Sequence, residues 1–210
     1  EKLMRDMAAI EVSPAQVLLE PQGRNTAAAV AAAVHSFIAS GQDPLLCVMP
    51  SDHAIRSPEK LLGAVAEGIP LAKAGRIVLF GVRPTRVETG YGYIRRDVPL
   101  GHSAFHVEGF VEKPDRAAAL KFIQDGGYDW NSGIFLFRAS VMREMIRRYS
   151  LVTDQGASES VAGAARLSNY IFLNTDGFSV CEAASIDRVV LERAQDLAVI
   201  PVKMGWSDLG

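Results

Sequence analysis

Two aspartates are the strongest candidates for holding a divalent cation. Asp52 follows an apolar run in the string PSDH, and Asp208 lies in the string GWSD after the last apolar run. Carboxylate oxygens at two separate strand ends could clamp Mg²⁺ on a polyphosphate, although only the fold can bring them together. His53 is better explained as an ordinary surface histidine than as a metal ligand, because magnesium prefers oxygen.

A lysine and a glutamate end another apolar run in the string VEKPD. Lys113 precedes a proline that can begin a helix, so its backbone is restricted and its ammonium could be aimed at a phosphate. The carboxylate of Glu112 could accept hydrogen bonds from hydroxyl groups. A solvent-exposed ion pair between the two is the alternative.

The string QGRNT leads into an alanine-rich helical pattern. Arg24, Asn25 and Thr26 would stand at the start of that helix, where free backbone N–H groups and the positive dipole end suit a phosphate or a base edge. The alternative is a capped helix, because Asn and Thr are good capping residues. The pattern alone leaves both open.

Two further strings place glycine or an amide beside an apolar run. In TGYGYI, Gly92 would let the backbone approach a ligand closely, or mark a bulged hairpin. In WNSG, Asn131 precedes the run 134–137 and carries the donor and acceptor that vicinal hydroxyls require, or simply forms a turn.

Short apolar runs alternate with helix-length segments, which predicts an open α/β fold with a mainly parallel mixed sheet flanked by helices. The expected strands are 16–19, 45–49, 76–80, 105–111, 134–137 and 197–202, and the expected helices are 26–39, 58–74, 115–125, 140–148 and 185–193. The small, polar and weakly periodic segment 151–169 is expected to be a surface excursion. Ligands of such sheets bind beyond the carboxyl ends of the strands, where the polar strings lie.

Composition excludes several classes of protein. The 210 residues are 49% hydrophobic, and 22 basic against 24 acidic residues leave a net charge of −2, so neither nucleic acid nor a membrane surface is indicated as a partner. Cys47 and Cys181 each lie among apolar neighbours and share no metal-binding spacing, which favours buried free thiols in a reducing cytoplasm. Neither a membrane span nor a signal peptide is indicated.

Read together, the strings resemble bacterial mannose-1-phosphate guanylyltransferases, of the kind often fused to a phosphomannose isomerase domain. The matching stretches, in order, are EPQGRNTAAA, MPSDHAI, TGYGYI, FVEKPD, WNSGIFLF, SIDRVVLERA and GWSDLG. The resemblance implies a Rossmann-like nucleotidyltransferase fold, dependence on Mg²⁺, and conversion of GTP and mannose 1-phosphate to GDP-mannose and pyrophosphate for polysaccharide synthesis.

The same resemblance implies a role for each candidate. Asp52 and Asp208 would hold the metal, and Lys113 would hold the sugar phosphate. Arg24, Asn25, Thr26 and Asp52 would lie along the nucleotide, and Gly92, Glu112 and Asn131 would contact the sugar.

The resemblance also implies missing parts. The first strand and the glycine-rich loop of the family are absent, so residues 1–210 are expected to form one nucleotidyltransferase domain that is incomplete at both ends. A fused isomerase domain outside the chain and a homo-oligomer are further expectations. The alternatives are another sugar-1-phosphate nucleotidyltransferase, for example one that uses glucose 1-phosphate or another nucleotide, and a non-catalytic regulatory subunit that binds nucleotide sugars.

Overall fold

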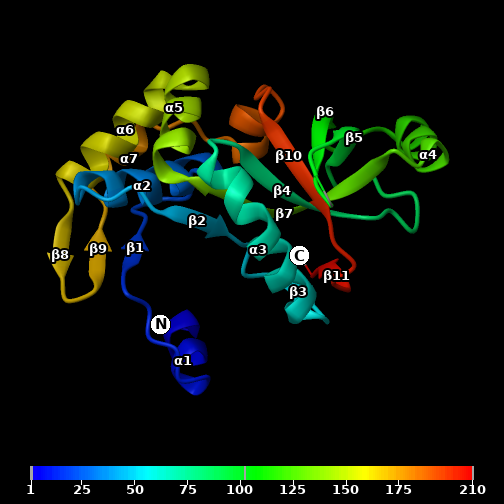
Figure 1. The fold of residues 1–210 in the computed structure, drawn as a ribbon. Coiled ribbons are helices and arrows are strands. Elements are labelled where there is room, and N and C mark those ends of the chain that lie inside the picture. The colour runs from blue at the N-terminus through cyan, green and yellow to red at the C-terminus, as the bar shows by residue number, and fades with distance from the viewer. Residues whose placement is uncertain (1, 102, 210) are drawn as a thin grey trace.

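The computed structural model describes residues 2–101 and 103–209 (Figure 1). The helices are α1 (Lys2–Ala9), α2 (Asn25–Ala39), α3 (Pro58–Lys73), α4 (Arg116–Asp125), α5 (Ala139–Tyr149), α6 (Leu151–Ala162), α7 (Thr175–Ser179) and the π-helical turn η1 (Asp187–Leu191). The strands are β1 (Val17–Leu19), β2 (Leu45–Val48), β3 (His53–Ile55), β4 (Ile77–Val82), β5 (Tyr93–Pro99), β6 (Phe105–Val111), β7 (Tyr128–Arg138), β8 (Ala165–Leu167), β9 (Tyr170–Phe172), β10 (Leu197–Pro201) and β11 (Trp206–Asp208).

A six-stranded sheet, in the order β2-β7-β4-β10-β6-β5, forms the centre of the molecule. The predicted α/β class with a mixed sheet flanked by helices is confirmed. Parallel pairs do not dominate it, however: β4 and β10 are parallel, while the other pairs among the described strands of this sheet are antiparallel. The reason is β7, whose 11 residues run antiparallel to β2, β4 and β5.

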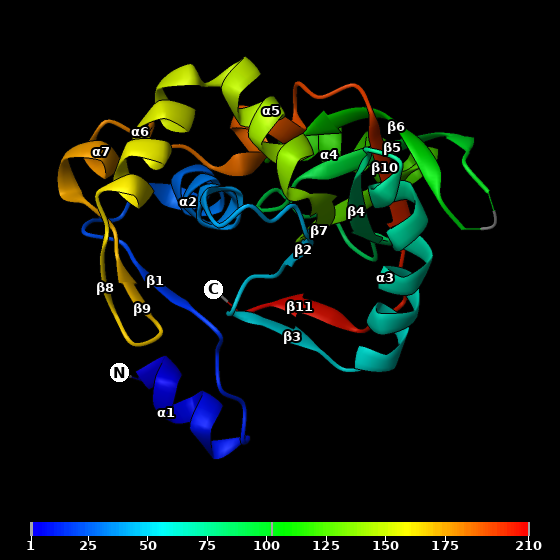
Figure 2. The ribbon, with the colours of Figure 1, turned by 60° about the vertical axis from the view of Figure 1, so that its left-hand side comes forward.

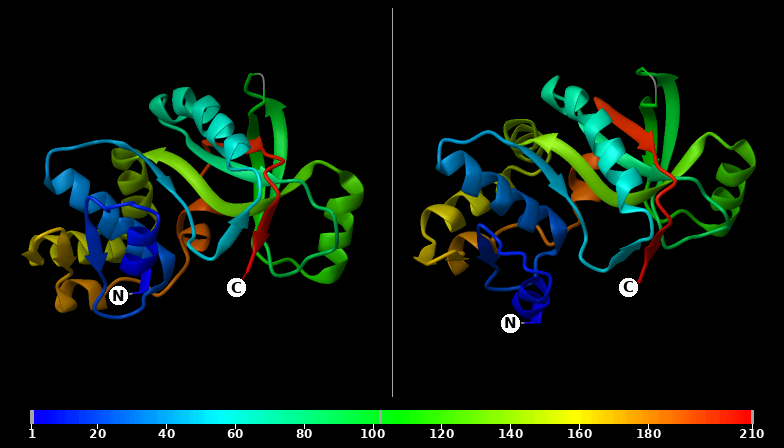
Figure 3. Two further views of the ribbon diagram at one scale, coloured as in Figure 1. Left: turned by 90° about the horizontal axis from the view of Figure 1, so that it is seen from below. Right: turned by 60° about the horizontal axis from the view of Figure 1, so that its bottom comes forward.

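Helices pack on both faces of this sheet (Figures 2 and 3). Phe135 and Phe137 belong to the apolar cluster that also contains buried residues of α2, α5, α6 and η1. Ile134 and Leu136 belong to a second cluster, with buried residues of α3. Successive residues of a strand point to opposite faces, so this stretch of β7 supplies both cores.

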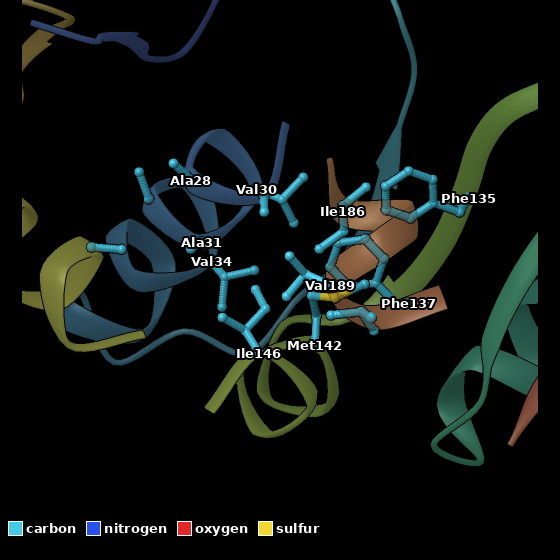
Figure 4. Packing of buried hydrophobic residues seen from close by; sticks show 14 of the residues in the cluster. Ala28, Val30, Ala31, Val34, Phe135, Phe137, Met142, Ile146, Ile186 and Val189 are labelled. Carbon is cyan, nitrogen blue, oxygen red and sulfur yellow. The ribbon is translucent and has the colours of Figure 1, made fainter. Parts of the chain in front are cut away.

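Helix α2 owes its close packing to alanine. Ala27, Ala28 and Ala31 are fully buried, and the helix lies against α5 and α6. Figure 4 shows Val34 of α2 lying toward Ile146 of α5 within this cluster. Burying a side chain the size of valine or isoleucine contributes roughly 1.5–3 kcal/mol relative to leaving it exposed. The start of α2 is therefore held by a well-packed helix.

The expectation of a surface excursion at 151–169 is wrong for α6, which is partly buried, while residues 163–169 lie at the surface as expected. A side chain on Gly156 would place its Cβ 2.7 Å from the carbonyl oxygen of Gly177, so α6 and α7 pack with their backbones in close contact. The small residues that weakened the helical pattern are the ones that allow this approach. The prediction failed because small size here serves packing and not solvent exposure.

Buried polar residues of α6 have hydrogen-bond partners inside the protein. Asp154 Oδ1 lies 2.8 Å from Nε2 of His35 on α2, and the two side chains are almost fully buried. Ser160 donates a hydrogen bond of 2.8 Å to the carbonyl oxygen of Asn174. Buried polar groups need such partners, and these partners are distant in sequence.

Two smaller sheets complete the fold. The predicted strand 16–19 forms as β1, but it pairs with β9 in a three-stranded sheet of order β1-β9-β8 and lies outside the central sheet. The short strands β3 and β11 pair antiparallel. Among the described residues, no helix is both long and apolar enough to cross a membrane.

A bulge interrupts β7 where it runs beside β4. Leu79 pairs with Phe135, and Gly81 pairs with Asn131. The chain therefore advances by two residues in β4 and by four residues in β7 between these two pairs. Gly133 lies within the bulge at φ 70°, in the left-handed region that favours glycine. The bulge follows Asn131 directly, so it adjoins one of the predicted site residues.

Candidate functional site

The two candidate metal ligands lie close together in the structure. Asp208 is the last residue of β11 and pairs with His53, the first residue of β3, and Asp52 immediately precedes that strand. The Leu209 N–H donates to the carbonyl oxygen of Asp52 at 3.1 Å. The pair is therefore positioned by the two-stranded β3–β11 sheet, whose strands follow the central strands β2 and β10 along the chain.

The donor set of this pair fits a magnesium ion. Oδ1 of Asp52 and Oδ1 of Asp208 each lie 3.9 Å from Nε2 of His53, and the two aspartate side chains are 64% and 32% exposed. Hard carboxylate oxygens that remain open to solvent suit Mg²⁺, which keeps water or phosphate oxygens in its other positions. Among the described residues, no group of three or more His, Cys, Asp or Glu side chains forms a complete metal site.

A pocket of about 590 Å³ contains several of the predicted site residues. Asn25 and Thr26 enter it from the start of α2, and Glu112 and Lys113 enter it from the end of β6. The segment around η1 forms another wall, with Ala183, Ala184, Ser185, Asp187, Arg188 and Glu192. Candidates for the nucleotide and for the sugar phosphate thus share one pocket.

The start of α2 is less open than we expected. The Thr26 N–H donates to Oδ1 of Asn25 at 2.8 Å, and the Ala27 N–H donates to the carbonyl oxygen of Ala184 at 3.1 Å. The Thr26 hydroxyl accepts the N–H of Ile186 at 2.9 Å. The expectation of free N–H groups is wrong for Thr26, whose N–H is bound by the side chain of Asn25, and for Ala27, because the segment before η1 packs against the helix end.

Arg24 precedes α2 and is half-buried. Burial raises the pKa of the Cys181 thiol, and the positive charge of Arg24 opposes that rise. The guanidinium of Arg24 therefore interacts electrostatically with Cys181, just after α7. Arg24 does not line the pocket of about 590 Å³ described above.

The chain bends sharply at Lys113. Its φ is 49°, a left-handed conformation that is strained for a residue other than glycine, and a proline follows it. Because the strand ends in this bend, neighbouring side chains can reach the same pocket. Lys113 Nζ lies 3.5 Å from Oε1 of Glu112, with the lysine side chain 65% exposed and the glutamate 18%.

Glu112 lies in an electrostatically unfavourable position. Burial raises its pKa, and the nearby carboxylate of Asp187 raises it further, while Lys113 lowers it. Glu112 also leaves no room for a side chain at Gly92, where a Cβ would stand 2.6 Å from its Oε2. The backbone at Gly92 therefore makes a close approach to the side chain of Glu112, which is a candidate site residue.

Asn131 contacts the pocket through another residue. Its Nδ2 donates a hydrogen bond of 2.7 Å to Oδ1 of Asp187, and its Oδ1 accepts the Gly133 N–H at 3.1 Å. Its own N–H donates to the carbonyl oxygen of Gly92 at 2.8 Å. Asn131 lies inside β7 and not before a strand, because β7 begins earlier than the apolar run indicated.

Asp187 is a pocket residue that the sequence pattern did not reveal. Burial raises the pKa of its carboxyl, and the hydrogen bond from Asn131 opposes that rise. It begins η1, where the Glu192 N–H donates to the Asp187 carbonyl oxygen at 2.8 Å. Such π-helical turns occur frequently at functional sites. The signal in the sequence that could have indicated Asp187 was an acidic residue within the apolar helical run 186–191.

The fold and the matching sequence define the class of protein: the chain belongs to the nucleotidyl transferase family, whose profile matches residues 1–210. A xanthan biosynthesis protein, XanB, of Xanthomonas campestris pv. campestris is 43% identical over 199 residues, which cover 95% of this chain and 42% of that protein. A mannose-1-phosphate guanylyltransferase of Escherichia coli K12 is 39% identical over 203 residues, which cover 92% of this chain and 42% of that protein.

A solved structure agrees with this assignment. A protein of Thermus thermophilus, described as a mannose-1-phosphate geranyltransferase, superposes with a TM-score of 0.81 at 32% identity, over 100% of this chain and 65% of that one. The chain spans about two fifths of the length of the curated relatives it matches.

Proposed function

We propose that this chain transfers GMP from GTP to mannose 1-phosphate, with release of GDP-mannose and pyrophosphate. The observation that carries the proposal is the position of the bulge in β7. Asn131 binds Asp187 of the pocket, and Gly133, two residues later, lies beside His53, whose Nε2 is equally distant from the two aspartates. One short segment thus connects the candidate sugar-phosphate pocket to the candidate metal site. Relatives that carry the name of this activity support the choice of substrates.

Each proposed role follows from the chemistry of the residue. Asp52 and Asp208 would hold Mg²⁺, which when bound would neutralise charge on the nucleotide phosphates. Lys113, whose ammonium is mostly exposed at the pocket, would hold the phosphate of the sugar. Arg24, Asn25 and Thr26 would lie along the nucleotide, where Asp52 would also contribute.

The sugar would lie against the side of the pocket formed by Glu112 and Asp187. Glu112 would accept hydrogen bonds from sugar hydroxyls, and Gly92 would leave room for its carboxylate. Asn131 would act on the sugar side by orienting Asp187, because its amide already donates to that carboxylate.

The reaction requires no general base. A phosphate oxygen of mannose 1-phosphate is already anionic, so it can bond directly to the α-phosphorus of GTP. The bond from that phosphorus to the bridging oxygen breaks, and pyrophosphate leaves with the electron pair. The barrier is the repulsion of two anions and their alignment, so residues that position and neutralise charge supply the catalysis.

A pyrophosphate-release assay on the full-length protein tests the proposal. GTP, ATP and UTP are each paired with mannose 1-phosphate and with glucose 1-phosphate, and the sugar-nucleotide product is identified by chromatography. We expect GTP with mannose 1-phosphate to give a kcat/KM at least about tenfold above any other pair. Preference for glucose 1-phosphate would indicate the sister activity, and binding without turnover would indicate a regulatory subunit.

We also propose a cytoplasmic location, supported by two free cysteines, of which Cys181 is buried as expected and Cys47 is exposed. The family resemblance further suggests a homo-oligomeric state and a fused isomerase domain. Light scattering on the full-length protein measures the oligomeric state. An assay with mannose 6-phosphate detects isomerase activity.

A further inference from the structure

A hydrogen bond between Trp206 and His53 selects one tautomer of the histidine. The indole Nε1–H of Trp206 donates to Nδ1 of His53 at 3.0 Å, and the two rings meet edge to face at 5.2 Å. An indole nitrogen can only donate, so Nδ1 must be the acceptor. The ring proton of His53 therefore resides on Nε2.

The Nε2–H of His53 faces both candidate metal ligands. Oδ1 of Asp52 and Oδ1 of Asp208 are each 3.9 Å from this nitrogen. That distance exceeds a direct hydrogen bond, so the N–H acts as the positive end of a dipole toward two negative groups. Because Nε2 carries the proton, it has no lone pair to offer a metal ion.

The imidazole is held in this orientation from several sides. Its side chain is only 11% exposed. A Cβ on Gly133 would stand 3.4 Å from Cε1 of His53 and 3.2 Å from Cγ of Pro50, so the bulge of β7 passes directly beside the ring. Trp206 in turn meets the ring of Tyr91 edge to face at 5.0 Å.

We propose that His53 is a positioning residue of the metal site: its Nε2–H, directed by Trp206, holds Asp52 and Asp208 in a shared orientation and offsets their mutual repulsion. The proposal rests on the proposed function of those aspartates. His53 acts through this one N–H group and does not bind the metal ion itself.

Two substitutions separate the two nitrogens of His53. His53→Asn retains an oxygen near Nδ1 that can accept the Trp206 indole, but it removes the N–H toward the carboxylates. His53→Gln places an amide N–H near the position of Nε2. Trp206→Phe keeps an aromatic ring and removes only the donor that selects the tautomer.

The first readout is Mn²⁺ binding by water-proton relaxation enhancement, which does not depend on turnover. We expect His53→Asn to raise the Kd for Mn²⁺ by roughly tenfold, as is typical when a group that orients metal ligands is lost. His53→Gln should stay within about threefold of the wild type, and Trp206→Phe should weaken binding by about threefold. The Mg²⁺ concentration that half-activates the full-length protein should follow the same order, while the KM for sugar phosphate at saturating Mg²⁺ stays unchanged.

Asp52→Asn and Asp208→Asn serve as references. If they bind Mn²⁺ like the wild type, the metal site of the proposed function is wrong. If they lose binding while His53→Asn retains it, only the positioning role is overturned. Equal losses in His53→Asn and His53→Gln would also overturn it, since the N–H would not matter. Thermal unfolding by circular dichroism monitors folding, and if His53→Asn does not fold, unchanged Mn²⁺ affinity in Trp206→Phe overturns the proposal.

Discussion

The side-chain amide of Asn131 donates a 2.7 Å hydrogen bond to the carboxylate of Asp187, and this contact joins the bulged strand β7 to η1 beside the pocket. Burial raises the pKa of Asp187 above its ordinary value of 3.8 despite that hydrogen bond. The contact thus holds a carboxyl group where its charge is unfavourable.

Substituting Asp187 should therefore change how stability depends on pH. The folded state keeps the Asp187 proton to higher pH than the unfolded state does, so stability is lost as pH rises from 3.8 through the raised pKa. Asp187→Asn stays neutral and can still accept the Asn131 hydrogen bond. The free energy of unfolding of the wild type relative to the variant should fall by up to about 1.4 kcal/mol per pH unit in that window. Urea unfolding at several pH values measures it, and parallel curves for the two proteins would contradict the assignment.

Removing either carboxylate of the β3–β11 sheet should impair catalysis. We expect Asp52→Asn and Asp208→Asn each to lower kcat by roughly 100-fold or more, the scale of losing a charged contact in the transition state. Steady-state turnover at saturating Mg²⁺ and GTP measures the effect. Near-normal turnover in either variant would remove that residue from the proposed metal site. Asp97→Asn, an exposed position on β5, is a control for loss of one negative charge.

Lys113→Ala should mainly weaken use of the sugar phosphate. The ammonium is mostly exposed at the pocket, and the nucleotide is expected to be held by other residues, namely Arg24, Asn25, Thr26 and Asp52. The KM for mannose 1-phosphate should rise by about tenfold or more, while the affinity for GTP changes little. Titration of both substrates in initial-rate assays separates the two. Equal losses for both would show that the lysine serves the nucleotide as well.

Gly92→Ala should disturb Glu112 without unfolding the protein. The added methyl group would stand 2.6 Å from Oε2 of Glu112, at the end of a side chain that can move away, and 3.1 Å from Cζ of Phe110, whose ring would have to shift slightly. We expect kcat/KM for the sugar phosphate to fall by roughly tenfold, with GTP binding retained. Gly90→Ala is the matched control, because its nearest contact, Oε1 of Glu88, would be at an ordinary 3.4 Å. Similar kinetics for both variants would remove Glu112 from the sugar side.

The sequence predicted local elements well where one face of an element is apolar throughout. Strand β6 spans 105–111 as expected, and α4 begins after the capping residue Asp115 and ends at Asp125, before Gly126, whose φ is 73°. Helix α6 could not be predicted from its pattern, because its burial depends on contacts with Gly177 and His35, which are distant in sequence.

The candidate site was partly predictable for a similar physical reason. Glu112 and Lys113 end a recognisable strand, so local sequence indicated them. The juxtaposition of Asp52 with Asp208 requires the short β3–β11 pair, which carries no clear hydrophobic alternation. Asp187 was missed because its carboxyl reaches the pocket only through an irregular turn of helix.

The bulge of β7 has a consequence for insertions and deletions. The two additional residue steps between Asn131 and Phe135 carry Gly133 to the imidazole of His53 while the strand keeps its pairing on either side. Deleting one residue there would move Asn131 to the opposite face or pull Gly133 away from His53. The site therefore depends on chain length at this point as much as on side-chain identity, and a shortened bulge would abolish it even if every named residue were retained.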